Sequence, residues 1–192
     1  MSLSRSFLFV SLLTCAFSCA QPGVEYKPTF RAGGILADSM DGEVSALGYA
    51  FSGSTDYSSV ELGIGATEYR DGERVALSEL VIAKSSFGDL DAIEISGGGR
   101  YFFSSSESMY PFVSIYAQNT VSETVPGTTL NLGTQLGLQL GAGVQYFVNE
   151  QFFIDSSLRY LIPLIPGKSN TFPEIETEFS GISLEIGIGV EL

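Results

Sequence analysis

Seven charged residues occupy positions from which they could act together. Each falls opposite the apolar residues of its segment, in stretches where apolar residues alternate with small or polar ones. In an extended chain alternate side chains point to opposite faces, so these charges would share one face of a sheet. The set is Arg31, Glu61, Glu94, Arg100, Asp155, Arg159 and Glu185. Three interpretations stay open: ion pairs that fill a narrow interior, a selectivity or gating cluster in a small pore, or charges whose face is misassigned. If the charges form ion pairs, Arg159 is expected to pair with Glu185 or Asp155, and Arg100 with Glu94 or Glu61.

The remaining residues give little support to enzyme chemistry. The chain has no histidine, which excludes Ser-His-Asp and Cys-His catalysis and histidine-ligated metals. No helical pattern follows the glycine run over 97–99, so it is not a phosphate-binding loop. A pair of carboxylates could perform acid–base chemistry, but no spacing singles out such a pair. We therefore predict that the protein is not an enzyme and has no cofactor and no metal site.

The first twenty residues have the features of a cleaved secretion signal. Arg5 precedes a short, mostly apolar run over 7–17, and the small residues Ser18 and Ala20 fit a cleavage site before Gln21. Residues 1–20 are therefore predicted to be a signal peptide.

Both cysteines of the chain, Cys15 and Cys19, lie in this segment. After cleavage the mature chain would have no disulfide and no reactive thiol. The alternative is a lipoprotein signal, in which Cys19 becomes the acylated first residue. Residues 21–28 are predicted to be a short linker, and residues 29–192 a single domain.

The longest alternation in the chain runs from Leu132 to Val148. Apolar residues occupy most of the even positions and Gly or Gln most of the odd ones, as in a long β-strand with one apolar face. A short turn over 149–151 follows, and the alternation resumes over 152–160. Long strands joined by a tight turn with aromatic residues beside it are typical of a transmembrane β-hairpin.

Similar alternation recurs along the rest of the chain and predicts an all-β fold. Turns are predicted over 38–42, 52–57 and 104–108, and loops over 121–130 and 161–178. The stretch 70–90 is ambiguous, because 71–72 signals a turn and 75–83 could be a strand with poor alternation. The predicted strands cover 30–36, 43–51, 60–69, 93–103, 110–119, 132–148, 152–160 and 179–192.

Segments in which a strand ends in aromatic residues before a short turn carry a family resemblance. They include Gly97-Gly98-Gly99-Arg100-Tyr101-Phe102-Phe103 and Gly141-Ala142-Gly143-Val144-Gln145-Tyr146-Phe147. The chain resembles the small outer-membrane β-barrels of the OmpA and OmpX type, grouped with porin-like β-barrel domains. The resemblance implies a closed, antiparallel, up-and-down transmembrane barrel in the outer membrane of a Gram-negative-type bacterium.

The same resemblance implies an even number of strands, short periplasmic turns and longer exterior loops. Eight strands fit if 70–90 is an exterior excursion, and ten fit only if that stretch adds two strands. The chain departs from the family in ending with Leu192 instead of an aromatic residue. It also has no tryptophan, so Tyr and Phe would form the interfacial girdles.

The charge balance narrows the classes of partner. The formal net charge is −13 at pH 7 and no basic cluster offsets it, which argues against nucleic acid. The first hypothesis is an outer-membrane barrel with a structural or surface-interaction role, with acidic exterior loops such as the one that carries Glu174, Glu176 and Glu178. Its partners would be outer-membrane lipid, the barrel-insertion machinery and an unknown surface partner. The alternatives are a narrow channel for small solutes, and a soluble or lipid-anchored barrel that binds an apolar ligand inside.

Overall fold

The computed structural model describes residues 23–87, 90–103, 108–122, 133–169 and 174–192, with the backbone alone described at 36–39, 90 and 122. The predicted signal peptide, Cys19, most of the predicted turn over 104–108 and most of the predicted loop over 121–130 lie outside these residues. Within them, no helix is long and apolar enough to cross a membrane.

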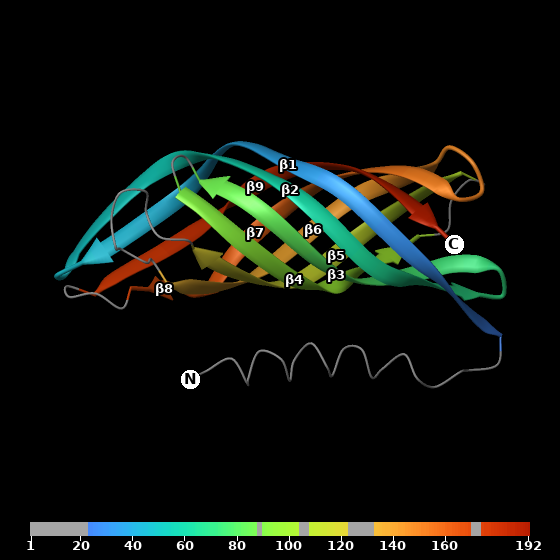
Figure 1. The fold of residues 1–192 in the computed structure, drawn as a ribbon, viewed down its shortest axis with the longest axis horizontal. Coiled ribbons are helices and arrows are strands. Elements are labelled where there is room, and N and C mark those ends of the chain that lie inside the picture. The colour runs from blue at the N-terminus through green and yellow to red at the C-terminus, as the bar shows by residue number, and fades with distance from the viewer. Residues whose placement is uncertain (1–22, 88–89, 104–107, 123–132, 170–173) are drawn as a thin grey trace.

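The described chain folds into long strands that wrap around one axis (Figure 1). Each strand pairs antiparallel with its neighbour in the order β1-β2-β3-β4-β5-β6-β7-β9, and β1 also pairs with β9. The ring of eight strands is therefore closed, and the two-residue β8 is an addition to the edge of β9. The strands are β1 (Val24–Ala46), β2 (Tyr49–Arg70), β3 (Glu73–Phe87), β4 (Leu90–Phe102), β5 (Met109–Ser122), β6 (Thr134–Phe147), β7 (Phe152–Ile165), β8 (Gly167–Lys168) and β9 (Ile175–Glu191).

The prediction of a closed antiparallel barrel of eight strands is confirmed, and the alternation explains its two surfaces. Along β9, Ile186 and Ile188 are exposed on the outside, whereas Glu185 is buried inside. Glycines on the inner face let neighbouring strands approach closely. A Cβ added to Gly98 would lie 2.1 Å from the carbonyl oxygen of Ile115, and one added to Gly143 would lie 2.2 Å from that of Ser156.

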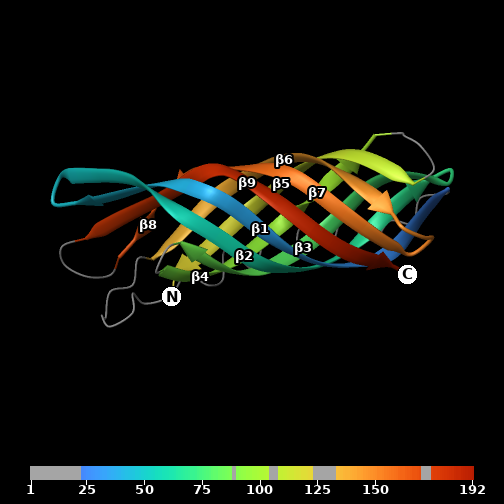
Figure 2. The same cartoon turned by 90° about the horizontal axis from the view of Figure 1, so that it is seen from above.

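The two ends of the barrel differ. The end that we call the terminal end carries Leu192, whose N–H donates to the Pro28 carbonyl, together with the turn at Asp71–Gly72. The opposite end, which we call the hairpin end, carries the β1–β2 hairpin. This hairpin and the paired part of β9 extend past most of the other strands (Figures 1 and 2).

The predicted turns over 38–42 and 52–57 are wrong. Both stretches lie inside strands, and a register shift between Ala37 and Met40 absorbs the irregularity in β1. The true turn is Leu47-Gly48, where both residues have positive φ (53° and 81°), the conformation of a two-residue hairpin turn. Asp, Ser and Gly are common in turns, but here cross-strand pairing holds the residues that suggested a turn in extended form.

The stretch 70–90 is neither an exterior excursion nor two strands. It contains one tight turn and the single strand β3. Between the pairs Glu68–Ala76 and Tyr69–Arg74, Val75 is an extra residue, so a β-bulge reverses the alternation within β3. The number of strands in the ring is still eight. Strand β3 adds one to the predicted strands, but the predicted strand 43–51 does not exist as a separate strand, because its residues belong to β1 and β2.

Two boundaries also move. Strand β1 begins at Val24, where it pairs with Arg70, so residues 24–28 belong to the barrel and not to a linker. The predicted loop 161–178 is shorter than expected, because β7 continues to Ile165 and β9 begins at Ile175.

Candidate functional site inside the barrel

All seven charged residues predicted to share a face lie buried within the barrel. They come from five strands: β1, β2, β4, β7 and β9. Six of them and one further residue form what we call the charged layer: Arg31, Glu61, Glu79, Arg100, Asp155, Arg159 and Glu185.

Glu185 has the most cationic partners in this layer. Its carboxylate contacts the guanidinium groups of Arg31 and Arg159, and its Oε1 lies 3.3 Å from Nη2 of Arg100. The Ser157 hydroxyl donates to the other carboxylate oxygen at 2.6 Å. Such a fully buried carboxylate is stable only because charged and polar partners replace its water.

Arg159 has one of its two predicted partners, and Arg100 has neither of its own. Arg159 pairs with Glu185 and also donates to Glu61 at 3.0 Å. Arg100 was expected to pair with Glu94 or Glu61, and that expectation is wrong: it pairs with Asp155 at 2.6 Å. Glu94 lies six residues away on the same strand, about 20 Å along it, whereas Asp155 reaches Arg100 across the narrow lumen.

Sequence reasoning missed two members of the network, Glu79 and Tyr116. Glu79 lies 3.3 Å from Nε of both Arg31 and Arg100. The Tyr116 hydroxyl donates to Glu79 and accepts from Nε of Arg100 at 3.2 Å. Glu79 interrupts the alternation predicted over 75–83, because it shares the inward face of β3 with the apolar residues Leu77 and Val81. Tyr116 could have been found from its place opposite the apolar residues of β5.

Two further groups of side chains fill the lumen on either side of the charged layer. Toward the terminal end, Arg74 pairs with Glu191 at 2.9 Å. Its guanidinium carbon lies 4.5–5.8 Å from four ring centroids, a cation–π arrangement that we call the arginine–aromatic layer. Toward the hairpin end, the apolar layer consists of Ile35, Met40, Tyr57, Phe87, Ala92 and Leu161, with Phe179 packed against them. The rings around Arg74 belong to Phe102, Tyr110, Phe147 and Phe153.

Acidic residues outnumber basic ones inside the barrel. Among the described residues six buried carboxylates face four buried guanidiniums. Glu94 is the clearest excess charge, because no ion pair joins it to a described Arg or Lys. Its Oε2 accepts a hydrogen bond from the Tyr57 hydroxyl at 2.9 Å, and its Oε1 has no described partner.

Replacement of Glu94 by Gln should therefore stabilise the folded barrel. The Gln side-chain oxygen can still accept from Tyr57, while the unpaired charge is gone, so we expect the free energy of unfolding to rise by roughly 1 kcal/mol. Urea unfolding of the refolded protein measures this. Glu94→Leu is the matched control. It removes the same charge, but unlike Gln it leaves the Tyr57 hydroxyl without an acceptor, so it should be destabilising. A loss of stability in Glu94→Gln would mean that the carboxylate has a cationic partner.

The arrangement offers no evident catalytic site. The buried carboxylates except Glu94 are engaged by arginines. No group of three or more acidic, His or Cys side chains within the described chain could hold a metal ion. The network can fix strand register and fill the lumen, which are structural tasks.

Comparison with known proteins identifies the fold but not a sequence family. No family of known sequences matches the chain, and no curated protein matches it. Among solved structures, Neisserial surface protein A is similar with a TM-score of 0.58 at 17% identity, covering 88% of this chain and 99% of that protein. The outer membrane protein OprG from Pseudomonas aeruginosa is similar with a TM-score of 0.56 at 16% identity, covering 88% of this chain and 96% of that one.

The chain has the fold of the small outer-membrane β-barrels. Barrels of this type carry an apolar band on the outside. Here the outward residues of the wall include Leu140, Ile154, Leu158, Ile186 and Ile188, all exposed. This arrangement is the reverse of what a soluble barrel with an apolar interior requires.

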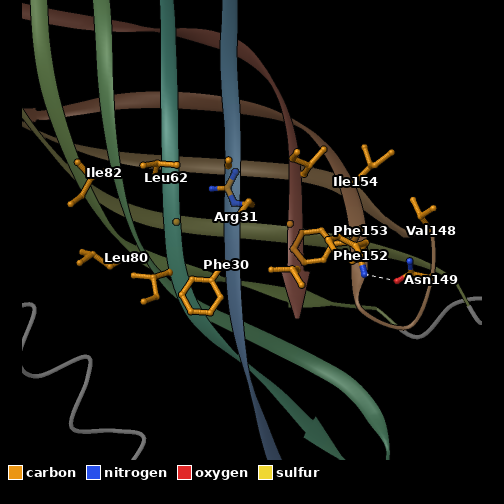
Figure 3. A pocket seen from close by; sticks show the side chains of 16 residues that line it. Phe30, Arg31, Leu62, Leu80, Ile82, Val148, Asn149, Phe152, Phe153 and Ile154 are labelled. Carbon is orange, nitrogen blue, oxygen red and sulfur yellow. Dashed lines mark hydrogen bonds between the residues drawn. The ribbon is translucent and has the colours of Figure 1, made fainter. Parts of the chain in front are cut away.

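The outside of the wall also contains an apolar hollow. It lies over β1, β2, β3, β7 and β9, and Phe30, Leu62, Ile82 and Ile154 contribute apolar side chains to it (Figure 3). The labelled Arg31 comes from the same wall but points into the lumen, where its ion pairs are (Figure 3).

Proposed function

We propose that the protein is an integral barrel of a Gram-negative-type outer membrane with a structural and surface-interaction role and no enzymatic activity. The observation that carries this proposal is the combination of an exposed apolar wall with a charged, filled interior. Exposed apolar side chains in such number are costly in water but favourable against acyl chains. In this setting the hollow of Figure 3 faces lipid.

The filled lumen favours a passive role over a channel. The arginine–aromatic layer, the charged layer and the apolar layer follow one another along the axis. Tyr116, Glu185 and Phe112 are each almost completely buried. A conducting pore needs a continuous water-filled path, and side chains that are packed and ion-paired across the lumen oppose one.

We assign the hairpin end to the cell exterior and the terminal end to the periplasm. The β1–β2 hairpin and the paired part of β9 extend past most of the other strands at the hairpin end, whereas the Asp71–Gly72 turn at the terminal end is short. Barrels of this type keep their periplasmic side short and let their exterior side grow. The exterior would then include the acidic segment in which Lys168 contacts Glu174 and Glu176. The Lys168 ammonium donates hydrogen bonds to Glu176 and Glu174. These bonds, with the one to Glu176 as the larger cause, raise its pKa above the ordinary value.

Membrane extraction and gel mobility test the proposal together. The protein should stay in the membrane fraction after carbonate washing, and unheated samples should migrate differently from boiled ones because a closed barrel resists detergent. Release by carbonate would contradict an integral barrel. In planar bilayers the refolded barrel should give no steady ion conductance, and steady single-channel currents would favour the narrow-channel alternative.

A further inference from the structure

Strand β2 has a free edge at the hairpin end. Strand β2 pairs with β1 from Tyr49 to Thr55 and from Tyr57 to Arg70, with Asp56 at the register shift. On its other side β3 pairs with β2 only from Tyr57 onward. Residues 49–55 are therefore paired on one side alone, and no other described residue pairs with their opposite side.

The composition of this edge does not protect it against pairing with another strand. Natural edge strands are commonly blunted by Lys, Pro or bulges, because unpaired N–H and C=O groups attract another strand. The stretch Tyr49-Ala50-Phe51-Ser52-Gly53-Ser54-Thr55-Asp56 contains no Lys and no Pro, and its one charge lies at the end nearest β3. Its pairing with β1 runs without a register shift from Tyr49 to Thr55.

The hairpin turn fixes which backbone groups face outward. A two-residue turn at Leu47-Gly48 makes Ala46 and Tyr49 the first hydrogen-bonded pair, and antiparallel pairs alternate after it. The N–H groups of Ala50, Ser52 and Ser54 are therefore directed to the free side. They present the donor and acceptor row that an added strand requires.

The side chains beside the edge define the chemistry of a partner. Tyr49 and Phe51 are 70% and 69% exposed, and Phe51 lies opposite Val44 on β1. On the other face of the strand Ala50 and Ser52 are small. Nearby carboxylates, Asp56 on β2 and Glu43 on β1, oppose an acidic partner.

We propose that the β2 edge over 49–55 binds an extended segment of another protein by β-strand addition. The segment would be uncharged or basic, with apolar side chains on alternate residues that pack against Tyr49 and Phe51. This deepens the surface-interaction role proposed above, and it rests on that role only for the side of the membrane on which the partner is met.

A second copy of this chain fits the edge poorly. Two barrels in one membrane are related by an axis along the membrane normal, so identical residues lie at the same height. The N–H of Ser52 in one copy would then face the N–H of Ser52 in the other. A strand from a different chain can instead choose the register in which donors meet acceptors.

A pair of synthetic peptides tests the proposal on the refolded, full-length barrel in detergent micelles. The probe is a blocked, fluorescent peptide of alternating Val and Thr with a Lys at each end. Its control has the same side chains, with N-methyl groups on alternate backbone nitrogens. Fluorescence anisotropy should show saturable binding of the probe and at least tenfold weaker binding of the control. Equal binding of the two would overturn strand addition, because side chains alone would then explain it.

Two barrel variants locate the site. Ser52→Pro removes an outward N–H and should weaken probe binding at least tenfold, whereas Ser52→Ala keeps that N–H and should bind as the wild type does. Each variant is first checked for heat-modifiable mobility. Failure of wild-type protein to bind the probe, with mobility intact, refutes the inference and leaves the barrel assignment standing. Efficient disulfide cross-linking of Ser52→Cys barrels to each other would name a second copy as the occupant and also refute it.

Discussion

Replacement of Arg100 by Met should destabilise the barrel by roughly 3–5 kcal/mol. Arg100 contacts Asp155 at 2.6 Å, Glu79 and Glu185 at 3.3 Å, and its guanidinium lies 4.5 Å from the Phe112 ring centroid. Because buried carboxylates already exceed buried guanidiniums, loss of an arginine leaves charge that no neighbour compensates. The midpoint of urea unfolding in lipid vesicles measures the loss.

The double variant Arg100→Met/Asp155→Asn separates lost charge balance from lost packing. The other guanidinium close to Asp155 is that of Arg31, 4.0 Å away, so removal of the Asp155 charge should recover much of the stability lost in the single variant. No recovery would mean that Arg100 stabilises the barrel by packing on Phe112 and Tyr116. An Arg100→Met barrel as stable as the wild type would show that the lumen is hydrated and its charges solvated.

Replacement of Ile186 by Arg should cost about 2–4 kcal/mol in lipid vesicles, the cost of a cation on the lipid face near the bilayer midplane. Ile186 is 52% exposed on the outside of β9, where it pairs with Gly34 of β1 and Ser156 of β7. Leu47→Arg is the matched control. Leu47 is 72% exposed at the hairpin turn, beyond the wall, so this variant should stay within about 0.5 kcal/mol of the wild type. Equal, small effects of the two changes would place Ile186 in water.

The face of each charged residue could be predicted from the sequence, but its partner could not. Whether Glu61 or Glu185 points inward depends on the residues beside it, because the two-residue period is local. Whether Arg100 meets Glu61 or Asp155 depends on the stagger of strands across the lumen, which no single segment encodes. Glu94 could have been excluded from the sequence, because six residues of one strand separate it from Arg100 by about 20 Å. Arg159 and Glu185 were the exception, because β7 and β9 are neighbours in the ring.

Strand β3 is hard to recognise in the sequence because a bulge and a mixed inward face both disturb its alternation. Before Val75 the inward residue is Arg74, and after it the inward residues are Leu77 and Glu79. A search for strict alternation fails across such a bulge, and beyond it apolar residues lie on both faces, with Leu77 inward and Leu80 and Ile82 outward. The hairpin turn was missed for the opposite reason: Leu47-Gly48 is less turn-like in composition than the Asp-, Ser- and Gly-containing stretches on either side.

The ion pair between Arg31 and Glu185 joins residues that are 154 positions apart, across the seam where β1 meets β9. It cannot form until the last strand docks on the first. If that docking slipped by two residues, the inward face would be kept, but Glu185 would move by ~7 Å along the strand relative to Arg31 and would no longer meet it in the present geometry, because each residue advances the strand by about 3.3 Å. The alternation of apolar and polar residues tolerates such a slip. The buried charges do not tolerate it, because their ion pairs depend on the register. They therefore distinguish the correct closure of the barrel from closures in which the strands are shifted.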